Sequence, residues 1–276
     1  MTADDLDLIL QAYHSLFDLR PLFFFDEIQN IEGWEHFARR LANQKYNIYI
    51  TGSNAKMLSR EIATTLGGRF WNKDVYPYSF AEYLNARNII LSKNWMYGKQ
   101  AAEVSKAFND YFLYGGFPEL TDVIAKRVWL NDIYSKIFFS DLIVRNKVRN
   151  EEALGLLVRR LAENVKQPVS YTRLANLISS IGIKISKATV IEFIRYLKES
   201  CLIFPIENYA AKFAERNSNM KHYFIDNGLL SIFLLDGNTS LLENIVAIHL
   251  YKRYGAQLYF YNQNIEVDFI IPEAKT

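Results

Sequence analysis

The spacing of apolar residues near the start of the chain predicts a strand, a helix and a second strand. Residues 22–25 are a continuous apolar run, which is long enough for one strand and too short for a helix. Such a run is typical of a strand covered on both faces, as in a parallel sheet. Residues 47–50, which are Asn-Ile-Tyr-Ile, have the pattern of a second buried strand, and residues 33–45 between them carry apolar side chains at helical spacing. The pattern therefore predicts an α/β unit.

The following part of the chain changes from mixed to mainly helical. Residues 70–76 are a candidate third strand, and residues 79–85 a short helix in which Ser79 and Glu82 form a capping box. Residues 88–150 have the pattern of helices, interrupted at Gly115, Gly116 and Pro118. We expect this stretch to be a helical, lid-like region.

Three helices and a β-hairpin are predicted after residue 150. The helices are expected at residues 151–165, 171–180 and 187–199, and the two strands at 202–206 and 221–225. This order is typical of a winged helix-turn-helix domain. Such domains commonly place the third helix in a DNA major groove, where Lys184, Lys187, Arg195 and Lys198 are candidate phosphate contacts. The helix is rich in apolar residues, and many winged helices bind proteins, so both partner classes stay open.

Two acidic residues follow the first predicted strand and are the candidate chemistry of the chain. Asp26 and Glu27 come directly after the apolar run, at the strand end where open α/β sheets place ligands. In a P-loop ATPase an aspartate here holds Mg²⁺, and a following glutamate orients the attacking water. The alternative is that two acids simply end a strand at the solvent.

A series of short motifs gives these acids a context. They are Phe-Phe-Phe-Asp-Glu-Ile-Gln from Phe23, Ile-Thr-Gly-Ser-Asn from Ile50, Leu-Gly-Gly-Arg, Tyr-Pro-Tyr-Ser-Phe-Ala-Glu-Tyr-Leu, Tyr-Gly-Gly-Phe-Pro-Glu and Glu-Val-Asp-Phe. In this order they resemble a prokaryotic AAA-type (P-loop) ATPase family. Members of that family carry an uncharacterised C-terminal region, with a winged helix and a restriction-endonuclease-like fold.

The resemblance implies roles for several residues, with ATP and Mg²⁺ as cofactors. Asp26 and Glu27 stand at the Walker B position, and Ser53 or Asn54 at sensor 1. Arg69 occupies an arginine position of the family, where it is either an arginine finger or an arginine that serves only solvation or a salt bridge.

The phosphate-binding Walker A motif is missing from this sequence. Of the twelve glycines, only Gly98 precedes a lysine, and Lys99 is followed by Gln100 rather than by serine or threonine. We expect the chain as given not to hydrolyse ATP. It is interpreted either as a truncated form or as a degenerate relative.

The C-terminal residues resemble the opening of an endonuclease-like fold. Glu243 and Asp268 stand in its acidic positions, and Glu273-Ala274-Lys275 spells a Glu-x-Lys motif. Four residues, Pro272 among them, separate this motif from Asp268, which is too few for a turn between antiparallel strands. We therefore expect no nuclease activity.

The whole chain is predicted to be an α/β protein with four regions. These are a partial AAA-type ATPase core (1–85), a helical lid-like region (86–150), a winged-helix-like domain (151–235) and a truncated endonuclease-like α/β segment (236–276). A net charge of +2 gives no general attraction to nucleic acid, and a single cysteine, Cys201, suits a reducing compartment. With no apolar run near the ~20 residues that cross a bilayer, a cytoplasmic protein without membrane contact is expected.

The second predicted strand has an edge that invites pairing. Residues 47–50 contain neither proline nor lysine, the residues that commonly protect an exposed edge. We expect residues 70–76 to pair there, or else a strand from another copy, which would make a homodimer.

Overall fold

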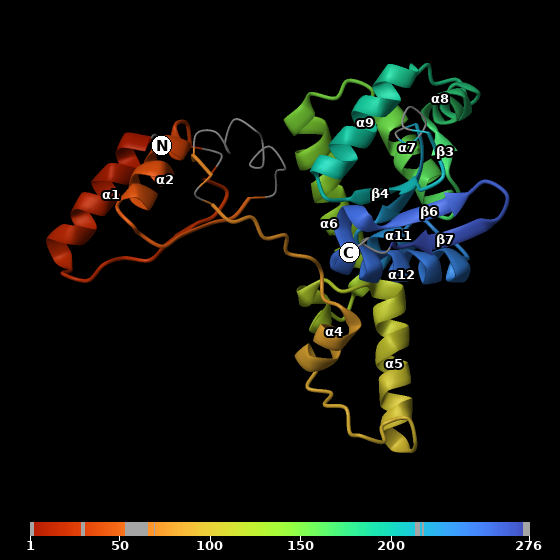
Figure 1. The fold of residues 1–276 in the computed structure, drawn as a ribbon, viewed down its shortest axis with the longest axis horizontal. Helices are drawn as coiled ribbons and strands as arrows, with labels where there is room; N and C mark the ends of the chain where they lie inside the picture. The colour runs from red at the N-terminus through yellow and green to blue at the C-terminus, as the bar shows by residue number, and fades with distance from the viewer. Residues whose placement is uncertain are drawn as a thin grey trace. The chain divides into compact units, whose positions relative to one another are not determined.

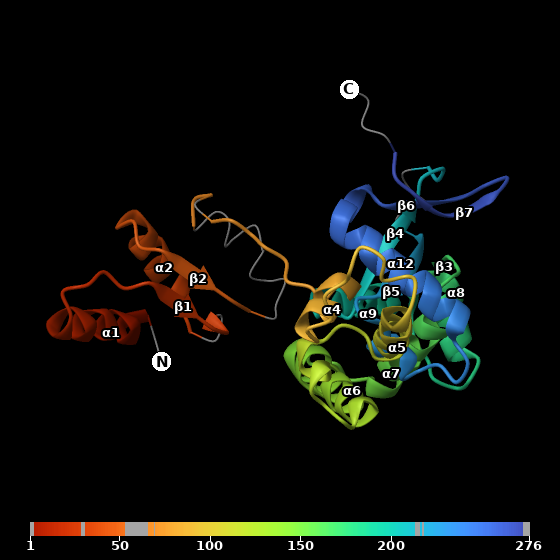
Figure 2. The same ribbon diagram turned by 90° about the horizontal axis from the view of Figure 1, so that it is seen from below.

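A computed structural model describes residues 3–28, 31–52, 66–68, 70–212, 216 and 218–272. It divides into two compact units, Met1–Val75 and Tyr76–Thr276 (Figures 1 and 2). The division into four regions drawn from the sequence stays a prediction.

The first unit contains the predicted strand, helix and strand. Its elements are α1 (Ala3–Leu16), β1 (Phe23–Phe25), α2 (Trp34–Asn43) and β2 (Ile48–Ile50). β1 and β2 pair in parallel, with Phe23 opposite Ile48 and Phe25 opposite Ile50. α2 buries its apolar face of Trp34, Phe37, Ala38 and Leu41, as its helical spacing predicts.

The described helices of this unit pack on one face of the β1–β2 pair. Phe23 and Phe25 point to that face and pack against α2 residues such as Phe37. Phe24 and Tyr49 alternate to the other face, where their rings stack at 4.9 Å and are 70% and 55% exposed.

The strand predicted at residues 70–76 is wrong, because this segment forms no β-strand. Trp71 and Val75 are almost fully exposed there, so these two side chains gain no burial that would hold a strand against a neighbour. Within the part of the chain that the structure describes, β2 pairs only with β1. The strand from a second copy therefore stays a prediction.

The second unit opens with helices. They are α4 (Phe80–Ala86), α5 (Lys99–Tyr114), η3 (Pro118–Thr121), α6 (Lys126–Lys136) and a π-helix, η4 (Ile137–Val144). The capping box at Ser79 and Glu82 is confirmed: the Ser79 hydroxyl accepts from the Glu82 amide, and the Glu82 carboxylate from the Ser79 amide. The predicted interruption is also confirmed, because α5 ends at Tyr114 and Gly115 is its C-cap.

The three helices and the hairpin predicted after residue 150 are confirmed as elements. They are α7 (Glu151–Glu163), α8 (Tyr171–Ser179), α9 (Lys187–Glu199), β4 (Ile203–Asn208) and β5 (Asn219–Phe224). The side chains of Asn150, Ser170 and Ser186 accept hydrogen bonds from the first turns of the three helices, which explains where each helix begins.

One mixed sheet joins this region to the C-terminal residues. β3 (Val169–Ser170), β6 (Tyr259–Asn262) and β7 (Glu266–Ile270) complete the strand order β3-β5-β4-β6-β7 among the described residues. β4 pairs with β5 antiparallel and with β6 parallel. The helices α11 (Asn227–Ser231) and α12 (Asn238–Tyr254) lie between β5 and β6 in the chain, with the short η5 (Gly255–Gln257) after them.

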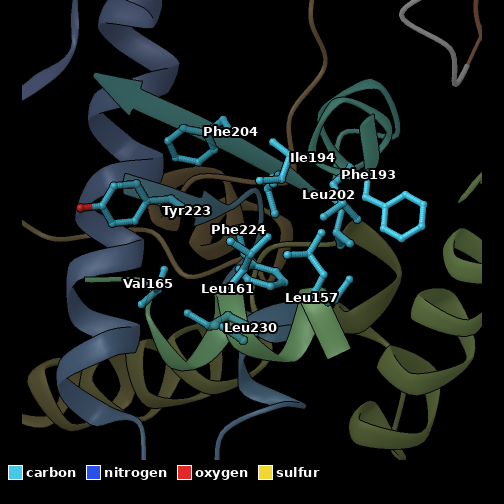
Figure 3. Packing of buried hydrophobic residues seen from close by; sticks show 14 of the residues in the cluster. Leu157, Leu161, Val165, Phe193, Ile194, Leu202, Phe204, Tyr223, Phe224 and Leu230 are labelled. Atoms are coloured by element: carbon cyan, nitrogen blue, oxygen red, sulfur yellow. The ribbon is translucent and has the colours of Figure 1, made fainter. Parts of the chain in front are cut away.

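The main core of the second unit draws on both its middle and its C-terminal elements. Figure 3 shows side chains of α7, α9, β4, β5 and α11 converging on one buried cluster. Leu157, Ile194 and Phe224 are among its members, and Phe260 of β6 belongs to the same cluster. Burial of this shared apolar surface is the main force that holds these elements together.

Candidate functional site

The carboxyl ends of β1 and β2 bring two polar side chains together. Asp26 follows β1 and Thr51 follows β2, and the parallel register that pairs Phe25 with Ile50 makes them neighbours. The Thr51 amide donates to the Phe25 carbonyl at 2.8 Å, and the Thr51 hydroxyl donates to the exposed Asp26 carboxylate. Both side chains present oxygen atoms, the ligand type that Mg²⁺ prefers.

Glu27 lies next to this pair in a sharp turn. Its φ of 49° is in the left-handed region, which is uncommon for a residue with a side chain. Ile28 follows it and is buried in a cluster with Trp34 and Ala38. The buried Ile28 thus anchors the turn that places Glu27, half-buried, directly after Asp26.

The other residues predicted for the nucleotide site, Ser53, Asn54 and Arg69, lie outside the described residues. The structure instead adds Thr51, to which the sequence analysis assigned no role. Its signal was present in the sequence, because Thr51 is the first polar residue after the second apolar run, as Asp26 is after the first.

A second polar cluster lies on the sheet of the second unit around a buried lysine. The side chain of Lys221, in β5, is 0% exposed. Its Nζ lies 2.8 Å from Asp268 Oδ1 in β7, 3.3 Å from Glu243 Oε1 in α12 and 3.6 Å from Glu266 Oε1. The structure therefore brings the two predicted acids, Glu243 and Asp268, to a common cation.

The carboxylates of this cluster already have partners for their negative charge. The Tyr223 hydroxyl donates to Glu243 Oε1 at 2.7 Å. Burial raises the pKa of the Glu243 carboxyl, against the lowering effects of Tyr223 and Lys221. Burial also raises the pKa of Tyr223, so this hydroxyl stays a donor at neutral pH. Lys221 occupies the position between the carboxylates that a bound cation would need.

The second cluster has little metal-binding character in the region that the structure covers. No group of three or more His, Cys, Asp or Glu side chains suited to a metal ion occurs among the described residues. Glu273 and Lys275 of the Glu-x-Lys motif lie outside those residues. The sequence analysis did not single out Lys221, although a lysine beside the apolar residues of a predicted strand is a usable signal.

The predicted DNA-binding side chains lie on the outside of the second unit. Lys184, Lys187, Arg195 and Lys198 are all exposed, on α9 or just before it. Arg195 lies 3.8 Å from Glu192 and 4.0 Å from Glu199. These acids reduce the positive charge of the face that was predicted to contact phosphates.

The sequence matches two family models and several proteins of related sequence. Residues 1–84 match the family described as AAA domain, and residues 105–240 match a domain of unknown function (DUF8612). An uncharacterized protein of Haemophilus influenzae is 31% identical over an alignment of 280 positions, which covers 99% of this chain and 68% of the relative. The chain belongs to the family of this protein.

Two uncharacterized proteins of Methanocaldococcus jannaschii extend the comparison. One is 33% identical over an alignment of 276 positions, which covers 97% of this chain and 62% of the relative. The other is 24% identical over an alignment of 302 positions, which covers 95% of this chain and 62% of the relative. The chain thus spans about two thirds of the length of these curated relatives. The AAA match supports an AAA-like P-loop family, in which nucleotide and Mg²⁺ binding are the expected properties.

None of the helices in the described ranges combines the length and the apolar character needed to cross a membrane.

Proposed function

We propose that the first unit is part of an AAA-type nucleotide site, in which Asp26 holds Mg²⁺ and Glu27 orients the attacking water. The observation that carries this proposal is the pairing of Asp26 with Thr51 at the carboxyl ends of two adjacent parallel strands. The match of residues 1–84 to the AAA domain supports it.

The two oxygen-bearing side chains fit the chemistry of the implied metal. Mg²⁺ usually keeps several waters and is held by one or two carboxylates together with phosphate oxygens. Asp26 would supply the carboxylate, and the Thr51 hydroxyl would hold that carboxylate in one orientation. When bound, Mg²⁺ supplies positive charge that neutralises phosphate oxygens. Glu27 is a carboxylate able to accept a proton from water beside it.

The chain contains no Gly-x-x-x-x-Gly-Lys-Ser/Thr sequence to cradle phosphates. Ser53, Asn54 and Arg69 remain proposed contributors to γ-phosphate sensing and to charge stabilisation. We propose that these 276 residues alone do not turn over ATP, and that the activity of the family requires a phosphate-binding segment in addition.

The metal-binding part is tested with Mn²⁺ as the probe. Electron paramagnetic resonance of the full chain titrated with Mn²⁺ in the presence of ADP should show bound metal that is lost in Asp26→Asn. Asp18→Asn, an exposed aspartate of the same unit, is the matched control and should bind as the wild type does. Equal Mn²⁺ binding by Asp26→Asn and the wild type would refute the role of Asp26.

Turnover is tested separately by phosphate release from Mg²⁺-ATP. We expect no release above background. Release that is abolished by Glu27→Gln would contradict the proposal that the chain alone is inactive.

A second candidate function rests on the arrangement of α7, α8, α9 and the β4–β5 hairpin. β3 lies between α7 and α8 in the chain and pairs with β5, which gives the strand and helix order of a winged helix. This supports a non-enzymatic role in binding DNA or a protein. Binding that weakens with salt, with a smaller slope in Lys187→Ala/Lys198→Ala, supports DNA. Undetectable or salt-independent binding leaves the protein-interaction scaffold as the remaining interpretation.

A further inference from the structure

Two of the sequence motifs that the proposed function leaves unexplained meet at one buried aspartate. Asp226 is 3% exposed. Its Oδ2 accepts from the Gly116 amide at 2.7 Å, and its Oδ1 accepts from the Gly228 amide at 2.7 Å. Gly116 belongs to the Tyr-Gly-Gly-Phe-Pro-Glu motif, so this motif is held by a residue 110 positions later in the chain.

The contact is so close that only glycine fits. A Cβ built on Gly115, whose φ is 80°, would lie 1.9 Å from Asp226 Oδ1. A Cβ on Gly228 would lie 2.1 Å from the Tyr114 carbonyl oxygen, and one on Gly116 2.3 Å from the Tyr78 carbonyl oxygen. The glycines therefore let three backbone segments approach one carboxylate.

The beginning of the second unit is tied to the same place. The Tyr78 amide donates to the Gly116 carbonyl at 2.7 Å, and the Tyr111 hydroxyl donates to the Tyr78 carbonyl at 2.8 Å. Lys252 of α12 donates to the Pro77 carbonyl. The Tyr-Pro-Tyr-Ser motif is thus anchored directly on Gly116 and, through Gly116, on Asp226.

Residues 76–116, here called the arm, also have a small core of their own. Its buried members are Tyr83, Leu84, Ile89, Val104, Ala107 and Tyr111. Polar contacts with the rest of the unit include Asp226 with Gly116, Asn227 with the Phe112 carbonyl at 3.0 Å, and the ion pair of Lys126 with Asp110. Phe112 and Tyr114 of the arm also pack against the main core, and Ile245 of α12 packs against the core of the arm, so release of the arm would expose these apolar side chains as well.

We propose that the arm docks on and releases from the rest of the second unit as one body. Asp226, here called the clasp, holds the arm in the docked state through its hydrogen bond from the Gly116 amide. Because residue 76 continues the chain from residue 75, the arm is the segment through which the AAA-matching residues are joined to the main core. This inference does not depend on nucleotide binding by Asp26.

The charge state of Asp226 gives the clasp a pH dependence. Burial raises the pKa of Asp226 to about 6, against the lowering effects of the Gly116, Gly228 and Leu229 amides and of Lys252. A carboxyl whose pKa is raised in the docked state favours docking most at low pH, and this advantage is lost as the pH rises through about 6. Release therefore increases with pH.

Tyr111 on α5 and Lys252 on α12 interact electrostatically with Asp226, and Glu82 on α4 interacts with both of them. Burial raises the pKa of Tyr111, and the Ser79 cap lowers the pKa of Glu82, so both move away from the window around 6. Burial lowers the pKa of Lys252, which carries the positive charge nearest this group. Lys252→Met should therefore shift the transition to higher pH.

Hydrogen exchange of the full chain, resolved to single amides by NMR and corrected for intrinsic rates, tests the clasp. We expect the amides of Tyr78, Gly116 and Gly228 to exchange together, and about tenfold faster at pH 8 than at pH 5. Amides in the middle of α5 should stay more strongly protected. Asp226→Asn should speed the three amides by about tenfold at pH 5, since one acceptor is lost, and remove their pH dependence. Asp141→Asn is the control, because it breaks an ion pair between Asp141 of η4 and Arg145, and it should change neither the exchange rates nor their pH dependence.

Three outcomes would overturn the inference. They are independent exchange of the three amides, exchange of the α5 amides as fast as theirs, and a pH profile that is the same in Asp226→Asn as in the wild type. If Asp226→Asn does not fold, the wild-type pH profile still decides, because a flat profile between pH 5 and 8 refutes the clasp.

Discussion

Replacing Lys221 by methionine should destabilise the second unit by an amount set by one carboxylate. The substitution keeps an unbranched chain of similar length in a fully buried position and removes the ammonium. Three acids then lose their common cation. The side chains of Glu266 and Asp268 are 47% and 55% exposed, so solvent screens their charges, and removing their ion pairs with Lys221 should cost little stability.

The size of the destabilisation depends mainly on Glu243, because only 12% of its side chain is exposed. Removing one partner of a buried ion pair generally costs 3–5 kcal/mol. Since Glu243 keeps its hydrogen bond from the Tyr223 hydroxyl, we expect the lower end, about 3 kcal/mol. Without Lys221 the pKa of Glu243 rises further. The folded state then takes up a proton that the unfolded state does not, so the loss should be larger at pH 8 than at pH 5.5.

Urea unfolding of the full chain, followed by far-UV circular dichroism at the two pH values, measures this loss. Lys184→Met, at an exposed lysine, is the matched control and should change stability by less than about 0.5 kcal/mol. Adding Glu243→Gln to Lys221→Met should recover most of the loss, because the uncompensated charge is gone. A loss below about 1 kcal/mol, or an equal loss at both pH values, would refute this account of the cluster.

Three further predictions follow from named contacts. Burial lowers the pKa of His222 to about 4, so its contribution to stability is complete above its ordinary pKa of 6.5 and falls as the pH drops towards 4; His222→Phe should remove up to about 3 kcal/mol of this pH dependence in urea unfolding, and an unchanged dependence would contradict it. Gly115→Ala should lower stability by about 3 kcal/mol or more, and Gly182→Ala, whose φ of 94° is similar but whose surroundings are open, by only about 1 kcal/mol; equal melting temperatures would show that space at Asp226 is unimportant. Any DNA binding should weaken with salt, and Arg195 should contribute little to the slope, because Glu192 and Glu199 lie beside it; in fluorescence anisotropy across a salt series, a slope reduced as much by Arg195→Ala as by Lys187→Ala would contradict this.

Local elements were predictable from the sequence because their signals are local. The caps at Ser79, Ser170 and Ser186 and the apolar spacing of α2, α7 and α9 all depend on residues within a few turns of one another. The strand expected at residues 70–76 failed for the complementary reason. A strand needs a neighbour and a buried face, and neither is encoded within the segment itself.

Tertiary structure alone decided which distant residues share a site. Thr51 meets Asp26 only because β1 and β2 pair in one parallel register. Lys221 reaches Asp268, 47 residues away, only through the strand order β5-β4-β6-β7, and Asp226 reaches Gly116 only where α11 packs against the end of α5. The sequence by itself determined the helices, the first two strands and the acidic residues at the end of β1. The partners of the buried charges were decided by strand pairing and close packing, because hydrogen bonds and ion pairs form between neighbours in space whatever their separation along the chain.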